Sequence, residues 1–226
     1  MYRYSKTQMY DFILPSMIFI GLAFLFHQTS LNEILAGQFY TLKAHWIYRD
    51  NFVLEKIFHK GGVLFTVAII FAIFVRLLYI CKNAEKKQQK NFLAFVLAST
   101  LLSISVIAIL KRTSTLPCPW DSTIFGGTSL TLPIWKMFSS DFPNAQCFPA
   151  GHSSAGFSFL SFYYSYLLVY RKRNFMLLLP GLIIGIVFGI TQQMRGAHFM
   201  SHDLATIFIT IWMSWVTYSI YTLYNK

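Results

Sequence analysis

The sequence has few acidic residues and few charged residues of any kind. Its 226 residues include 8 Asp and Glu, and charged residues make up 12% of the chain, which is about half the share that soluble domains carry. A soluble domain of this length needs a polar surface to stay dissolved. The composition therefore argues against an ordinary cytosolic enzyme and a disordered protein, and three cysteines are too few for a disulfide-dense secreted domain.

Hydrophobic residues, by contrast, make up 55% of the chain and aromatic residues 18%, which is typical of lipid-facing surfaces with aromatic belts. A bilayer-spanning helix needs about 20 mostly apolar residues. We expect an all-α integral membrane bundle of six transmembrane helices in a single domain, residues 1–226. The expected spans are 11–26, 63–81, 92–110, 155–170, 175–194 and 204–223. The first is not expected to be a cleaved signal peptide, because no small-residue cleavage site follows it.

The net charge of +11 comes mainly from basic residues between the spans. Nucleic-acid binding needs such residues on one soluble face, so we expect no nucleic-acid partner. Ten of them lie in four short segments, and the positive-inside rule places those segments in the cytoplasm with both termini. The ten are Arg3, Lys6, Lys82, Lys86, Lys87, Lys90, Arg171, Lys172, Arg173 and Lys226.

Two stretches of the first outer connection have apolar residues at helical spacing. Residues 31–42 and 53–58 are both expected to form short amphipathic helices on the outer membrane surface. The second outer connection contains Cys118 and Cys147. An oxidising compartment there would favour a disulfide between them, although two unrelated thiols would fit the sequence as well. Cys81, at the cytoplasmic end of its span, is expected to stay reduced.

Polar residues collect at the outer ends of the spans, where they often mark function. Three of them offer positive charge to phosphate oxygens, one glycine lets the backbone approach a ligand, and two histidines can act as nucleophile and general acid. An aspartate could hold a histidine in one tautomer. The basic residues are Lys111, Arg112 and Arg195, the glycine is Gly151, the histidines are His198 and His152, and the aspartate is Asp203. This set can carry phosphoryl transfer with no metal and no cofactor.

These residues resemble the signatures of the type 2 phosphatidic acid phosphatase superfamily, a family of integral membrane lipid phosphatases. Its three motifs are K-x6-R-P, P-S-G-H and S-R-x5-H-x3-D. Here they read Lys111-x6-Cys118-Pro119, then Pro149-Ala150-Gly151-His152, then a segment ending in His198 and Asp203. The resemblance implies that His198 is the nucleophile that forms a phosphohistidine and that His152 protonates the leaving oxygen. It also implies that Asp203 orients His198 and that Lys111 binds phosphate.

The sequence departs from this pattern in each motif. Cys118 replaces an arginine, Ala150 replaces a serine, and Thr191-Gln192 replace the Ser-Arg pair. Arg195 follows Gln192 by nearly one helical turn, so we expect it to take over that phosphate contact.

The third motif also has one extra residue between His198 and Asp203, so we expect a break at Phe199-Met200-Ser201. In a continuous helix, His202 would stack below His198 and Asp203 would be the weaker assignment. A Cys118–Cys147 bridge would hold the first motif beside the second.

The expected function is a metal-independent lipid-phosphate phosphatase of bacterial type. Its partners would be the bilayer and a phosphorylated membrane lipid, of the lipid A, undecaprenyl diphosphate, phosphatidylglycerol phosphate or phosphatidic acid type. We expect it in the inner (plasma) membrane with its site facing the periplasm or exterior. Three alternatives stay open: a lipid phosphotransferase with the same site, a non-catalytic binding or transport protein of the same fold, and a metal enzyme using His198, His202 and Asp203.

Overall fold

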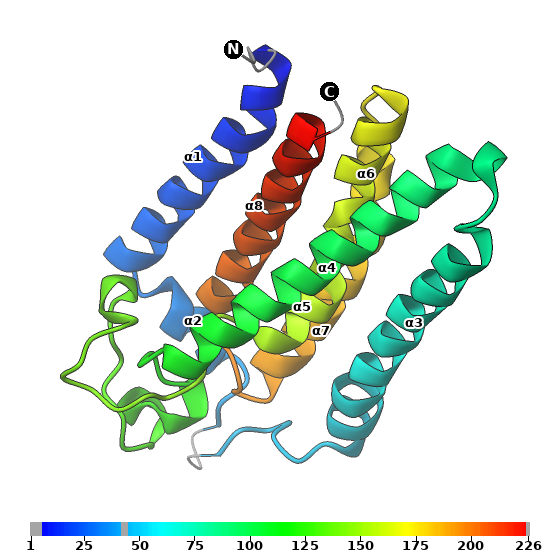
Figure 1. Ribbon diagram of the computed structural model, residues 1–226. Helices are drawn as coiled ribbons and strands as arrows, with labels where there is room; N and C mark the ends of the chain where they lie inside the picture. The colour runs from blue at the N-terminus through cyan, green and yellow to red at the C-terminus, as the bar shows by residue number, and fades with distance from the viewer. Residues whose placement is uncertain (1–5, 42–44, 225–226) are drawn as a thin grey trace.

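The chain folds as a bundle of helices joined by loops, in a computed structural model that describes residues 6–41 and 45–224. Long helices run roughly along one direction, and the start of α1 lies at the same end as the end of α8 (Figure 1). The all-α prediction is confirmed. The α-helices are α1 (Lys6–Gln28), α2 (Leu31–Gly37), α3 (Gly62–Ile80), α4 (Lys87–Thr113), α5 (Gly151–Phe157), α6 (Ser161–Tyr170), α7 (Leu179–Met194) and α8 (Met200–Tyr224).

Shorter helical elements connect these helices. Val53–Gly61 is a π-helix, η1, and the others are single 3-10 turns. Between α4 and α5 the chain forms a long loop that lies with α2 at the end of the bundle away from the start of α1 (Figure 1). The 3-10 turns are η2 (Ala84–Lys86), η3 (Pro119–Asp121), η4 (Thr123–Phe125), η5 (Ile134–Lys136), η6 (Ser158–Leu160) and η7 (Phe175–Leu178).

Four of the described helices are long and apolar enough to cross a membrane, and a fifth span results if α1 and α2 are one span bent by 75°. The structure therefore supports four or five of the six expected spans. The expected span 155–170 does not qualify: α5, η6 and α6 follow one another without a gap, but this stretch carries many serines and tyrosines, which lower its hydropathy. The four helices are Val53–Ile80, Ala84–Thr113, Phe175–Met194 and Met200–Leu223.

The segment 53–58 is not the separate surface helix that its sequence predicts. It forms part of η1, and η1 runs directly into α3, because Gly61 and Gly62 both have helical dihedral angles. The expected helix in 31–42 is present as α2. Arg3 and Lys226, used above to orient the chain, lie outside the described residues, as does Leu42. The continuous helix Val53–Ile80 places residues 58 and 59 against the start of α5, where the site lies.

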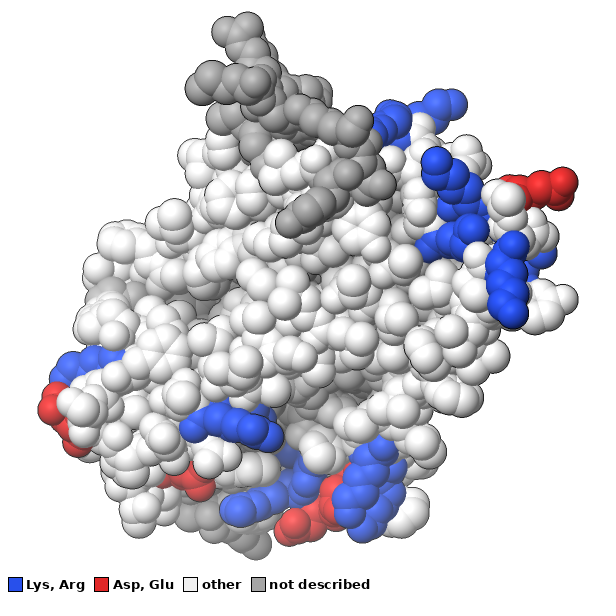
Figure 2. All heavy atoms as spheres, in the orientation of Figure 1, with Lys and Arg blue, Asp and Glu red and all other residues white. Residues whose placement is uncertain are grey.

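Small hydroxyl side chains line the inside of the bundle, while large apolar side chains face outward. Ser99 of α4 donates to Ser214 of α8 at 2.9 Å, and Ser165 of α6 donates to the carbonyl of Phe92 at 2.8 Å. Phe71 on α3 is 65% exposed. Interhelical hydroxyl contacts of this kind are typical of helices packed within a membrane. In Figure 2 the described charged side chains gather at two ends of the visible face, with an uncharged band between them.

Helices α5 and α7 cross at very close range because both carry glycine at the crossing. A Cβ placed on Gly156 would overlap the backbone of Gly185, and a Cβ on Gly185 would overlap the ring of Phe157. Small residues let helix backbones approach in this way. The crossing fixes the start of α5 against the end of α7, and both ends contribute residues to the site.

Candidate active site

The predicted site residues come from four elements that meet at one end of the bundle. Lys111 lies in the last turn of α4 and His152 in the first turn of α5. Arg195 and His198 lie in the segment between α7 and α8. The charge of Lys111 acts on both His152 and His198, and the charge of Arg195 acts on His152. Positive charge and two imidazoles are therefore gathered in one place.

Lys111 lies directly against the backbone of Gly151. A Cβ on Gly151 would be 3.3 Å from Lys111 Cδ and 3.6 Å from its Nζ, so a larger residue would push the lysine aside. The sequence predicts that a ligand approaches the backbone at Gly151, and in the structure the side chain of Lys111 lies at that position. An ammonium held beside the first residue of α5 is suited to a phosphate oxygen.

His152 is held by its surroundings in a defined orientation. Its Nε2 lies 3.0 Å from the carbonyl oxygen of Phe58, which can only accept, so this nitrogen carries a proton. The ring also packs on Phe188, with ring centroids 5.0 Å apart. Burial first, and then the charge of His59, lower the pKa of His152 to about 4. In the free protein His152 is therefore neutral, with its Nδ1 left to exchange a proton.

His59 is a site residue that the sequence analysis did not find. Its ring lies against that of His152, with centroids 4.5 Å apart, and its buried Nδ1 has no hydrogen-bond partner among the described residues. The first expectation for residues 53–58 was a surface helix, which would have left His59 in solvent. The helix in fact continues into the next span and brings His59 to the site. The Gly61-Gly62 pair suggests a helix end, so the sequence does not predict this continuation.

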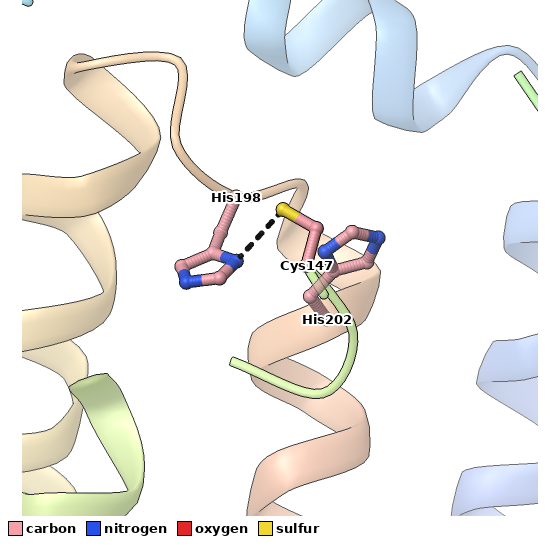
Figure 3. A group of neighbouring side chains, drawn as sticks. All are labelled: Cys147, His198 and His202. Atoms are coloured by element: carbon pink, nitrogen blue, oxygen red, sulfur yellow. Dashed lines mark hydrogen bonds between the residues drawn. The ribbon is translucent and has the colours of Figure 1, made fainter. Parts of the chain in front are cut away.

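His198 lies in a turn between α7 and α8. Helix α7 ends at Met194, and Gly196 has a left-handed φ of 76°, which glycine adopts without strain. Trp46 packs on Gly196 so closely that no side chain fits there. The Nδ1 of His198 lies 3.5 Å from Cys147 Sγ, so Nε2 is on the far side of the ring (Figure 3). Burial lowers the pKa of His198 well below its usual value, which keeps this imidazole neutral.

The expected bond between Cys118 and Cys147 is present, with the two Cα atoms 5.3 Å apart. It joins the first-motif segment to the residues just before His152. The same segment is also tied to the His198 turn, since the Trp120 amide donates to the carbonyl of Gly196 at 3.0 Å. The segment that the disulfide holds therefore contacts both the second motif and the His198 turn.

Asp203 is not placed as expected. Its Oδ2 accepts a hydrogen bond from Gln193 Nε2 at 2.7 Å, and among the described residues no hydrogen bond joins it to His198. The physical reason is the position of the break, which lies at residues 195–199 and includes only Phe199 of the expected three. Helix α8 begins at Met200, so Asp203 points about 100° away from His202. His202 is the residue beside His198, with ring centroids 5.8 Å apart.

The structure brings Arg195 to the site but not Arg112. Arg195 Nε donates to the carbonyl of Arg49 at 3.0 Å, and its NH1 donates to Gln192 at 3.4 Å. Arg112 is exposed, because consecutive residues of a helix point about 100° apart and Lys111 takes the inward direction. Gln192, at the position of the family's arginine, has a buried Nε2 with no partner among the described residues. Its amide is a free donor beside Arg195.

Comparison with known families agrees with this geometry. Residues 92–226 match the family model of the PAP2 superfamily. The chain belongs to the PAP2 superfamily. Its members are phosphatases, which supports phosphatase activity on phosphorylated lipids or similar substrates. The match includes every residue of the three motifs and leaves out η1 with Phe58 and His59. No curated protein and no solved structure matches the chain.

Proposed function

We propose that this PAP2 superfamily member releases phosphate from an envelope lipid, a phosphomonoester or a diphosphate, through a phosphohistidine on His198. The observation that carries the proposal is the environment of His198. This buried, neutral imidazole has Nδ1 against Cys147, and no hydrogen bond from another described residue occupies its Nε2. The positive charge of Lys111 acts on the ring. A neutral imidazole beside fixed positive charge is suited to attack a phosphate anion.

In the proposed first step, the Nε2 lone pair attacks phosphorus and the bond to the lipid oxygen breaks. His152, protonated when the phosphate anion binds, gives its Nδ1 proton to that oxygen, while Nε2–H stays on the Phe58 carbonyl. In the second step His152 takes a proton from water, the water oxygen attacks phosphorus, and the bond to His198 breaks. Inorganic phosphate leaves and His152 is protonated again.

Phosphate oxygens would be held by Lys111, by Arg195 and by the unpaired amide of Gln192. No step needs a metal, so the proposed reaction is metal-independent. Asp203 would act indirectly: through Gln193 it fastens the end of α7, from which the His198 turn starts.

The proposed substrate is a lipid whose phosphate lies at the outer membrane surface. The four or five apolar helices end near the site. The charge pattern of the loops supports an orientation with the site on the exterior, and we propose the inner (plasma) membrane as the location. Lipid A, undecaprenyl diphosphate and phosphatidylglycerol phosphate are the substrate types we rank first. A phosphotransferase would use the same residues and differ only in the acceptor.

The test is a panel of lipid phosphates given to the detergent-purified protein, with inorganic phosphate and lipid products both measured. We expect phosphate release from at least one lipid by the wild type and none by His198→Ala. If phosphate disappears from the donor lipid but appears on a second lipid, the protein is a transferase. Equal release by wild type and His198→Ala would contradict the proposal. No release from any lipid by a folded wild type would favour a non-catalytic protein.

A further inference from the structure

Behind the nucleophile lies a group of side chains with the chemistry of a metal site. One ligand atom each from Cys147, His198 and His202 lies within 4.8 Å of the others, and the three residues are 0%, 5% and 3% exposed. Figure 3 shows Nδ1 of His198 turned toward the Cys147 sulfur and the ring of His202 on the other side of that sulfur. Sulfur with two imidazole nitrogens is a donor set that Zn²⁺ prefers.

The disulfide determines whether this donor set can bind a metal. While Cys147 is bonded to Cys118, its sulfur carries no negative charge and is a poor ligand. A dithiol can reduce the bond: it becomes a disulfide itself, and Cys118 and Cys147 become thiols. Binding of Zn²⁺ to the Cys147 sulfur then releases the thiol proton to solvent.

We propose that reduction of the Cys118–Cys147 disulfide opens an inhibitory Zn²⁺ site formed by Cys147 Sγ, His198 Nδ1 and a ring nitrogen of His202. The distances fit. In a tetrahedral site, a bond of about 2.3 Å to sulfur and one of about 2.0 Å to nitrogen place the sulfur and the nitrogen about 3.5 Å apart. Cys147 Sγ already lies 3.5 Å from His198 Nδ1. A small rotation of the His202 ring would bring its nitrogen within bonding distance of the ion.

An ion can reach the cluster from solvent. His202 lines a cavity of about 490 Å³ between α1, α2 and the loop after α4. The rim includes Thr29 and Ser30, which are exposed, and Glu33 supplies a negative charge. The buried Nδ1 of His202 has no partner among the described residues, so this ring gives up no hydrogen bond at that nitrogen when a metal binds. The fourth coordination position can take a water from the cavity.

The effect on catalysis rests on the proposed function. Zn²⁺ takes the lone pair of Nδ1, so the ring proton that Nδ1 carries in the active form moves to Nε2, which then has no lone pair with which to attack phosphorus. The cation also repels the positive charge that a phosphohistidine carries. Zn²⁺ at this site therefore lowers the rate of the first step without occupying the place of the phosphate. The disulfide state and the metal together act as a switch on His198.

Two variants, each lacking one cysteine of the disulfide, distinguish inhibition by Zn²⁺ from the effect of losing the disulfide itself. Cys118→Ser leaves the Cys147 thiol beside the histidines, while Cys147→Ser removes the one sulfur that belongs to the ligand group. We expect micromolar Zn²⁺ to lower the activity of Cys118→Ser by tenfold or more, with no reductant present. Cys147→Ser should keep its own metal-free activity, and wild type should respond only after treatment with dithiothreitol, removed under anaerobic conditions before metal is added.

Co²⁺ provides a readout that does not depend on activity. We expect Cys118→Ser and reduced wild type to show the ultraviolet charge-transfer band of a Co²⁺–thiolate bond with visible bands of tetrahedral Co²⁺, and Cys147→Ser and oxidised wild type to show neither. His202→Gln in the Cys118→Ser background should weaken Co²⁺ binding. The same spectrum in Cys147→Ser, or no spectrum in reduced wild type, would overturn the proposal. Because the spectrum needs no substrate, it tests the metal site even if the protein proves to release no phosphate.

Discussion

At the scale of single residues, the environments of His152 and His198 set the pH dependence of the proposed reaction. His198 must be neutral to attack, and burial lowers its pKa, so it stays neutral well below its ordinary value. His152 must be protonated to donate, and its pKa in the free protein is about 4. We therefore predict a bell-shaped profile of kcat/KM whose maximum lies on the acid side of neutrality. The profile of kcat should lie at higher pH, because a bound phosphate anion raises the pKa of His152.

The proposed pH dependence can be tested by replacing His59. After burial, its charge is the largest cause that lowers the pKa of His152. Replacing it by asparagine removes that charge, so the pKa of His152 rises. Since the protonated form is the active one, the alkaline limb of kcat/KM should move to higher pH in His59→Asn. Lys136→Gln, which changes a charge in the outer loop away from His152, should leave the limb in place. An unmoved limb in His59→Asn would contradict the assignment.

Gln192 offers a second test because its amide is buried and unpaired. A hydrogen bond to a charged group contributes about 1.5–3 kcal/mol, so Gln192→Leu, which keeps the size but removes the donor, should lower kcat/KM by about tenfold or more. Steady-state kinetics on the lipid identified by the panel measure this, with thermal unfolding as the check that the variant is folded. A value of kcat/KM equal to that of the wild type would show that Gln192 does not contact the phosphate.

At the scale of elements, sequence patterns predict four or five of the spans, because apolar runs are local signals. They do not predict where helices join or stop. Gly61-Gly62 suggests a break, yet the helix continues and brings His59 to the site. The turn before α8 packs against Trp46 at Gly196, and α8 begins at Met200. That single boundary decides that His202, and not Asp203, faces His198.

The close crossing of α5 and α7 predicts how a larger residue at Gly156 changes the stability of the protein. Gly156→Ala places a methyl group into the Gly185 backbone, so the helices must separate, at a cost of about 1–3 kcal/mol in the free energy of unfolding. Thermal unfolding in detergent should show a lower Tm, and activity should fall because the crossing also fixes His152. Gly21→Ala in α1 is the matched control, since no atom lies within 4 Å of the new methyl group. An equal Tm for both variants would contradict the packing argument.

At the scale of the whole molecule, the position of the charges predicts which end faces the cytoplasm. Cys81 follows α3 and is exposed, and it is the one free cysteine of the described residues. We predict that a membrane-impermeant maleimide does not label Cys81 in intact cells and labels it after lysis. Ser140→Cys, on the exposed outer loop, should react in intact cells. Labelling of Cys81 before lysis would reverse the proposed orientation and place the site in the cytoplasm.

The most direct measurement of the central claim is the capture of the phosphoenzyme. Wild type and His198→Ala are mixed with a ³²P-labelled lipid phosphate that the panel has identified, quenched within milliseconds in alkali, and digested for mass spectrometry. We predict an alkali-stable, acid-labile phosphate on the peptide that contains His198 in the wild type, and none in His198→Ala. An active wild type that never carries label, or label that persists in His198→Ala, would contradict nucleophilic catalysis by His198.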